Sequence, residues 1–135
     1  MPNISPEHYR KTLETIELLN ISCIKMSAHI SHELLTPQMN ISIRDQASFE
    51  NIDQGFKVEN KYTLTSKNNE KKTAIKIECV YLITFKSSKD IDEDFFDIYK
   101  THSLPLNVWP FFREYVNSLT SRMNIQPLTL PLMKR

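Results

Sequence analysis

The sequence predicts an α+β fold, in which a short N-terminal helix precedes a four-stranded antiparallel sheet and two helices close the chain. Four segments alternate apolar and polar residues with the period of two that is typical of β-strands. The connections between these segments are polar and too short to hold crossover helices, which favours antiparallel pairing. After residue 90 the apolar spacing changes to three and four residues, as in helices. With 135 residues, the chain is expected to form one domain, spanning 1–135.

The N-terminal helix is predicted over about residues 6–19. Ser5 can cap the free amides of the first turn, and proline suits the first helical position at Pro6. Leu13, Ile16 and Leu19 then follow at helical spacing, which predicts a short amphipathic helix.

The four strands are predicted over about residues 20–30, 39–44, 56–65 and 75–85. Pro37 ends the first run, and Asn68 and Asn69 lie in a polar segment that is expected to form the hairpin tip between the third and fourth strands. The fourth strand has the most regular alternation. Its apolar face consists of Ile75, Ile77, Cys79, Tyr81, Ile83 and Phe85. Val80 and Leu82 make the opposite face apolar as well toward the strand's end.

Two helices are predicted to close the chain. Acidic residues within 90–94 begin the first, where negative charge suits the helix dipole, and Phe95, Phe96 and Tyr99 follow. Residues 101–108 are predicted as a linker, and Pro110 as the start of the last helix. The apolar face of this last helix consists of Phe112, Tyr115, Val116, Leu119 and Met123. The tail after residue 124 contains two prolines and is expected to be extended.

The composition excludes several classes of protein. Seventeen basic and sixteen acidic residues give a formal charge of +1, so there is no electrostatic case for nucleic acid or a membrane surface as partner. No run approaches the length of a membrane span, and the charged first 20 residues do not resemble a signal peptide. The single glycine, Gly55, leaves no glycine-rich loop for a nucleotide, and no cofactor is expected. Cys23 and Cys79, in apolar strand-like runs, favour a reducing cytoplasm.

Three groups of polar residues are candidates for chemical sites. His29 and His32 are three apart, which on a strand sends them to opposite faces, so no metal site is expected. Cys79 and His102 lack any local pattern of a nucleophile and its base. The acids at 90–94 lack the alternating spacing and central glycine of a calcium loop. We therefore expect no catalytic residues and no enzyme activity.

The segment 104–112 holds more apolar side chains than a connection needs. Its large residues are Leu104, Leu106, Val108, Trp109, Phe111 and Phe112. Such a surplus beside a predicted linker is typical of a partner-binding surface. Core packing or an oligomer interface is the alternative for each of these residues, and the sequence leaves it open.

Residues 107–114, with the sequence Asn-Val-Trp-Pro-Phe-Phe-Arg-Glu, resemble the signature of the SecB family of protein-export chaperones. The resemblance continues through Ser118, Ser121 and Arg122 to Gln126, Pro127, Leu128, Leu130 and Pro131. It implies helices packed on one side of the four-stranded sheet, assembly as a homotetramer (a dimer of dimers), and unfolded or nascent polypeptides as partners. Within the family, apolar grooves would hold the clients, and the implied walls are Met39, Ile41, Ile43, Leu104, Leu106, Val108 and Trp109.

A second partner of the family is the motor protein SecA, and Glu78 matches one acidic motor contact. Two other features depart from the motor-binding members. Acidic residues are not evident on the first strand, and the sequence closes on Lys134 and Arg135 where those members carry an acidic extension. These departures leave SecA open as a partner. The N-terminal helix and the missing acidic extension look more like SecB-like chaperones that serve dedicated clients, including those of toxin-antitoxin modules.

The sequence thus predicts a cytoplasmic, ATP-independent holdase for unfolded or non-native polypeptides, which serves protein export or one dedicated client. The alternative is a noncatalytic interaction scaffold with one specific folded partner. A homotetramer, or at least a dimer, is expected because helices on one side of a sheet leave its other face and its edges uncovered.

Overall fold

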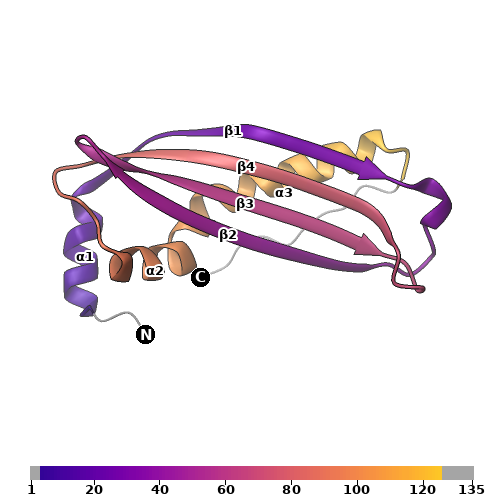
Figure 1. Ribbon diagram of the computed structural model, residues 1–135, viewed down its shortest axis with the longest axis horizontal. Coiled ribbons are helices and arrows are strands. Elements are labelled where there is room, and N and C mark those ends of the chain that lie inside the picture. The colour runs from indigo at the N-terminus through magenta and orange to yellow at the C-terminus, as the bar shows by residue number, and fades with distance from the viewer. Residues whose placement is uncertain (1–3, 126–135) are drawn as a thin grey trace.

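The computed structural model describes residues 4–125 and shows a long antiparallel sheet with helices on one face (Figure 1). The elements in chain order are α1 (Pro6–Glu14), β1 (Ile16–Ile30), the 3-10 turn η1 (His32–Leu34), β2 (Asn40–Ile52), β3 (Gly55–Lys67), β4 (Thr73–Ser87), α2 (Glu93–His102) and α3 (Leu104–Arg122). The strand order is β1-β4-β3-β2, so β1 and β2 form the two edges. The predicted α+β class, the antiparallel four-stranded sheet and the placement of helices on one side are confirmed. The predicted extended tail lies outside the described residues.

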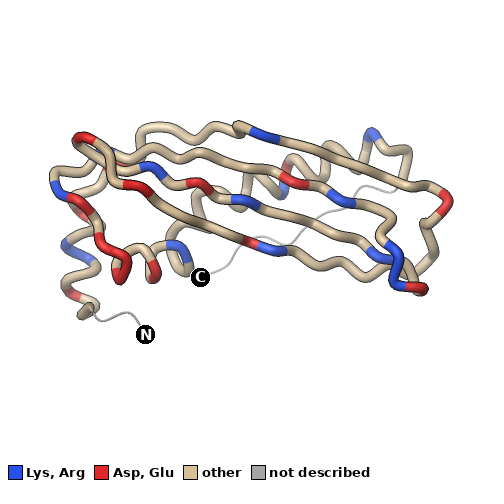
Figure 2. Tube along the Cα trace, viewed as in Figure 1, with Lys and Arg blue, Asp and Glu red and all other residues tan. Residues whose placement is uncertain are grey.

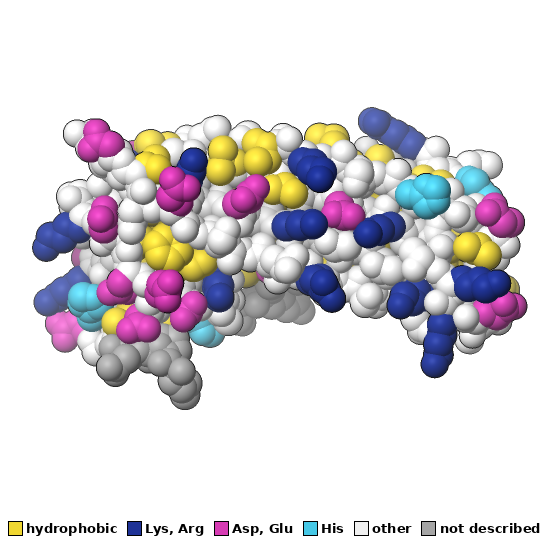
Figure 3. Space-filling view, viewed as in Figure 1, with side chains coloured by type: hydrophobic (Ala, Val, Ile, Leu, Met, Phe, Trp, Pro, Cys, Tyr) yellow, Lys and Arg dark blue, Asp and Glu magenta, His cyan; other side chains and the backbone are white. Residues whose placement is uncertain are grey.

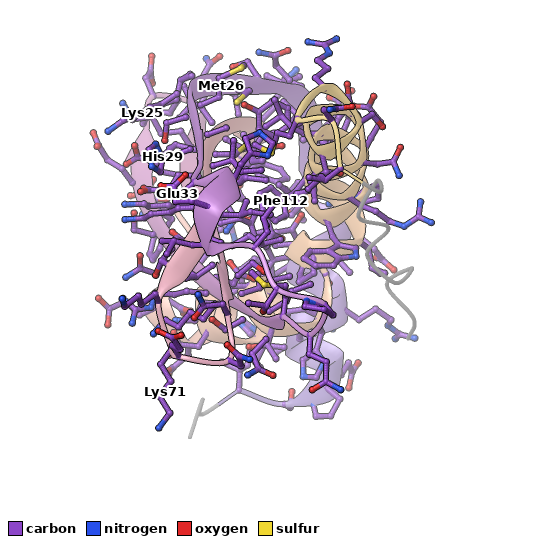
Figure 4. The ribbon with its side chains drawn as sticks, turned by 90° about the vertical axis from the view of Figure 1, so that its right-hand side faces the viewer. Lys25, Met26, His29, Glu33, Lys71 and Phe112 are labelled. Carbon is purple, nitrogen blue, oxygen red and sulfur yellow. The ribbon has the colours of Figure 1, made fainter. Side chains whose placement is uncertain are left out.

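The core lies between α2 and α3 and the face of the sheet that these helices cover. Along α3 the buried side chains recur every four residues, at Leu104, Val108, Phe112, Val116 and Thr120. Phe112 points from α3 toward the sheet (Figure 4), where its ring stacks on Tyr62 of β3 with centroids 4.8 Å apart. This aromatic contact joins the longest helix to the middle of the sheet.

The N-terminal helix is shorter than predicted. Its start is confirmed, because the Ser5 hydroxyl accepts a hydrogen bond from the His8 amide at 3.1 Å. The helix ends at Glu14, and residues 16–19, which were predicted to be helical, begin β1 instead. The reason is that β4 extends to Ser87, so Ile16 has a strand partner there. Pairing along this ladder outweighs the local helical spacing.

Strand β2 is twice as long as predicted and continues to Ile52. Its second half was missed because polar residues dominate it, and of the four side chains in register with the covered face of β3 only Ala47 and Phe49 are apolar, while Asp45 and Asn51 are polar. Asn51 is held by a specific contact with Ile91. The Asn51 side-chain amide donates to the Ile91 carbonyl at 3.0 Å and accepts from the Ile91 amide at 3.1 Å.

The predicted linker over residues 101–108 is wrong, because almost all of it is helical. Helix α2 continues to His102 and α3 begins at Leu104, so only Ser103 separates them. Pro105 lies in the first turn of α3, where no amide donor is needed, and it takes the role that was predicted for Pro110. Pro110 lies inside the helix on its exposed side, between the buried Trp109 and the exposed Phe111.

Candidate functional site

The predicted groove residues on β2 lie at the start of an edge strand. Ile41 is 43% exposed, while Met39 and Ile43 are half-buried against the core. By register with β3, Ile41 and Ile43 lie on the same face of the sheet as the core residue Leu64. These side chains therefore form an apolar margin where the covered face of the sheet meets solvent.

The predicted groove residues on α3 are mostly part of the core. Leu104 and Val108 are 1% and 0% exposed, and Trp109 is 8% exposed. The Trp109 ring lies edge-on to Tyr62, with centroids 5.6 Å apart. Leu106 is half-buried. Leu104, Val108 and Trp109 thus pack in the core, which is the alternative that the sequence left open for them. Leu106 has more accessible surface than these three residues.

Edge strand β1 exposes a second apolar region that the sequence analysis missed. Its large exposed side chains are Leu18, Leu19, Ile24 and Met26, which are 41% to 55% exposed. The pairing with β4 is irregular at Leu19 and Ile24, where the alternation of side chains between the two faces is interrupted. Apolar residues at both even and odd positions of the strand therefore reach the surface. Apolar side chains are visible along this upper edge in Figure 3. The consecutive apolar pair at 18 and 19 was the available signal, but it was assigned to the helix.

A hollow of about 480 Å³ separates β2 from the helices in the middle of the molecule. Its lining residues are Asp45, Gln46, Ala47, Lys100, Thr101 and Pro105. The Asp45 carboxylate accepts a hydrogen bond from the Asn60 amide nitrogen at 2.7 Å, and the same nitrogen donates to the Gln46 carbonyl at 3.0 Å. Two buried polar atoms of β3, the Asn60 side-chain oxygen and the Tyr62 hydroxyl, have no hydrogen-bond partner among the described residues. The middle of the β2 edge, beside the helices, is therefore polar.

Burial raises the pKa of Asp45, although the hydrogen bond from Asn60 opposes the shift. The residue reaches the surface while its neighbours partly enclose the carboxylate. Because the folded state then holds a proton more tightly than the unfolded state, stability rises as the pH falls through the folded pKa. An ionised Asp45 is thus slightly unfavourable at neutral pH.

Asp45→Asn is expected to keep the Asn60 contact and to leave the protein as stable as the parent, or more stable by less than about 1 kcal/mol, at pH 7. The difference should disappear as acid protonates the parent's carboxyl. Thermal unfolding of both proteins across this pH range measures it. A variant that is clearly less stable than the parent at pH 7 would contradict the burial argument.

Glu78 lies on the other face of the sheet, turned away from the helices. Its carboxylate is 3.2 Å from the ammonium groups of both Lys61 and Lys76. Hydrogen bonds from Lys61 and then Lys76 hold the pKa of Glu78 below its usual range. The proposed motor contact is thus an ionised group that two lysines already neutralise.

The other chemical groups lie apart. His102 is exposed at the end of α2, and burial raises the pKa of the Cys79 thiol to about 12, which keeps it protonated at neutral pH. Within residues 4–125, no three His, Cys, Asp or Glu side chains are grouped to hold a metal ion. No helix in that range is long and apolar enough to cross a membrane.

Fold and surface together define a class: a small α+β domain with a helix-covered antiparallel sheet and exposed apolar side chains on both edge strands. The family model described as "Preprotein translocase subunit SecB" matches residues 16–133. The chain therefore belongs to the SecB family, and the resemblance in the sequence is confirmed.

A solved structure shares this fold. The Mycobacterium tuberculosis SecB-like chaperone Rv1957, in complex with a ChAD peptide from the HigA1 antitoxin Rv1956, superimposes with a TM-score of 0.78 at 18% identity, covering 94% of this chain and 97% of that one. A Streptococcus agalactiae protein of unknown function gives a TM-score of 0.49 at 9% identity, covering 87% and 97%. No curated protein matches the sequence.

Proposed function

We propose that this chain is a cytoplasmic, ATP-independent holdase that binds unfolded or non-native polypeptides as extended segments. The observation that carries the proposal is the apolar surface at the start of edge strand β2 in a SecB-family sheet, where Ile41 is exposed beside the half-buried Met39 and Ile43. Such surface is uncommon on a monomeric protein unless a partner covers it. The similar M. tuberculosis chaperone binds an antitoxin peptide, which supports a polypeptide partner.

The client groove is proposed to follow the start of β2, with Met39, Ile41, Ile43 and Leu106 as its accessible walls. Leu104, Val108 and Trp109 support it from the core. As an edge strand, β2 has backbone groups that an extended segment can pair with, while the apolar walls contact alternate side chains of that segment. Burial of client side chains contributes about 25 cal/mol per Å², which the ordering of the client offsets in part, so several contacts must act together.

Ile41→Ser is expected to weaken the binding of denatured clients by about fivefold, because it removes an exposed apolar wall without opening the core. Ile52→Ser is the matched control, since Ile52 is a similarly exposed isoleucine at the far end of the same strand. The measurement is suppression of aggregation for several chemically denatured proteins.

The same panel separates the candidate functions. A holdase suppresses the aggregation of many clients, whereas a scaffold with one folded partner suppresses none. A panel that contains export precursors and an antitoxin further separates general export from one dedicated client. Equal losses in the Ile41 and Ile52 variants would contradict the placement of the groove.

The apolar β1 edge is proposed to be covered by a second copy of the chain in a dimer or homotetramer. A long edge strand with exposed apolar side chains readily pairs with another strand. Light scattering at micromolar concentration should therefore give a multiple of the chain mass of 15.9 kDa. A 15.9 kDa monomer as the sole species would contradict this assembly.

A further inference from the structure

The outer face of the sheet, which is turned away from the helices, divides into two halves of different charge. The register of the strands places side chains of this face in transverse rows, such as Arg44–Thr63–Glu78 and Ser42–Thr65–Lys76. Figure 4 shows Lys25 and His29 of β1 pointing to this same side, away from α3. The rows therefore give the order in which charged side chains follow one another along the outer face.

The half nearest the β3–β4 hairpin is strongly basic. It holds one acidic residue, Glu78, and five basic residues, Lys25, Arg44, Lys61, Lys67 and Lys76. The other half holds three acidic residues, Glu17, Glu50 and Glu59, and two basic residues, Lys57 and Lys86. Figure 3 shows this division, with dark blue side chains gathered toward the right and magenta ones toward the left; Figure 2 shows the same segregation along the chain trace. A net charge of +1 for the whole chain thus conceals a concentrated positive region.

A hollow of about 410 Å³ lies within the basic half. Three of its lining residues carry hydroxyls (Ser42, Thr63 and Thr65), three carry positive charge (Arg44, Lys67 and Lys76), the seventh is Ile43, and none is acidic. Arg44 and Lys67 take part in none of the ion pairs among the described residues, and Lys76 shares the single carboxylate of Glu78 with Lys61. The hollow therefore has positive charge that its own neighbours do not neutralise, together with hydroxyls that can donate to an oxyanion.

We propose that this hollow is a docking site for an acidic, extended segment of a partner polypeptide. Successive rows of the outer face lie about 7 Å apart, which is the distance between alternate side chains of an extended chain. Carboxylates at alternate positions of a segment that lies along β3 can therefore stand above Thr63 and Thr65, whose hydroxyls can donate to their oxygens, while the long side chains of Arg44 on β2 and Lys76 on β4 can reach the same carboxylates from the flanking strands.

A peptide fits this site better than a nucleic acid does. Glu78 stands inside the basic half and the acidic half continues the same face, so a long polyanion would meet repulsion beyond a few residues. A short segment with few carboxylates meets only the hollow. The hollow opens on the outer face of the sheet, whereas the proposed client groove follows the covered face, and Ile43 borders both.

The test uses the full chain and a fluorescent peptide of alternating Glu and Ala, with binding followed by anisotropy. The parent should bind this peptide, and binding should weaken as salt is raised from about 0.05 M to about 0.3 M. Arg44→Gln with Lys67→Gln should weaken binding about tenfold, since two cations are removed. Lys57→Gln with Lys86→Gln removes the same charge from the other half of the face and should leave binding nearly unchanged.

Glu78→Gln provides a variant whose expected effect is a gain. Releasing Lys61 and Lys76 from their shared carboxylate should strengthen peptide binding about threefold. Circular dichroism verifies that each variant is folded, and client suppression should remain at the parent's level in all of them. The proposal would be overturned if the Lys57/Lys86 double variant lost as much peptide binding as the Arg44/Lys67 double variant, or if Glu78→Gln gave no gain. It would also be overturned if a single-stranded oligonucleotide displaced the peptide as well as unlabelled peptide does.

Discussion

Replacing Trp109 by alanine is expected to lower the free energy of unfolding by about 3 to 5 kcal/mol, through the lost transfer energy of the indole and the cavity that remains. The indole is 8% exposed and lies against Tyr62 and Phe112, with ring centroids 5.6 and 6.0 Å away. Thermal or denaturant unfolding of the variant measures the loss. The matched control is Phe111→Ala, because the neighbouring ring is 52% exposed and its removal should change stability by no more than about 0.5 kcal/mol.

Client affinity of the folded Trp109→Ala protein separates support from direct contact. If Trp109 supports the groove from the core, the fraction that stays folded should bind denatured clients nearly as well as the parent. A stable variant that loses about 2 kcal/mol of client affinity would instead make Trp109 a contact residue and would contradict the core assignment.

Gly55→Ala is expected to destabilise the sheet by about 3 kcal/mol or more, an effect typical of overpacking against backbone. A Cβ atom at this position would lie 2.0 Å from the carbonyl oxygen of Phe85 on β4, so the strands would have to separate. The adjacent rings of Phe56 and Phe85 stack with centroids 4.5 Å apart, and any shift would disturb them as well. This close approach explains the one glycine of the chain.

The control for Gly55 is its neighbour in the turn. Gln54 has a φ of 60°, in the left-handed region, so Gln54→Gly should be neutral or should stabilise the protein by up to about 1 kcal/mol. Chemical denaturation of both variants tests the pair. A Gly55→Ala protein as stable as the parent would show that the close contact with Phe85 does not exist in solution.

The parts of the fold that the sequence predicted are those in which local pattern and tertiary contact agree. The alternation from Ile75 to Phe85 marked β4, which is covered by helices on one face and paired on both edges. Ser5 marked the start of α1 by a contact within one turn. The secondary structure was predicted wrongly where pairing with a strand distant in the sequence determines it. Residues 16–19 become strand because β4 extends to Ser87, and the polar half of β2 is held by its pairing with β3.

The functional surfaces were harder to predict because exposure depends on register. The assumed linker made Leu104, Val108 and Trp109 look like surplus apolar surface, but as one helix they form a stripe directed at the core. Met26 of β1 has the pattern of a buried strand residue and is exposed because its strand is an edge. The basic half of the outer face joins residues of four strands, and only their alignment brings Arg44, Lys67 and Lys76 to one hollow.

The most direct test of the central claim is the binding of one polypeptide in two states. A reduced, carboxymethylated protein that cannot refold is titrated calorimetrically into the chain, and its native form is titrated in parallel. The proposal predicts that the unfolded form binds with a negative heat-capacity change, as burial of apolar surface requires, and that the native form gives no binding. Binding of the native form alone, or of neither form across several polypeptides, would contradict the assignment as a holdase.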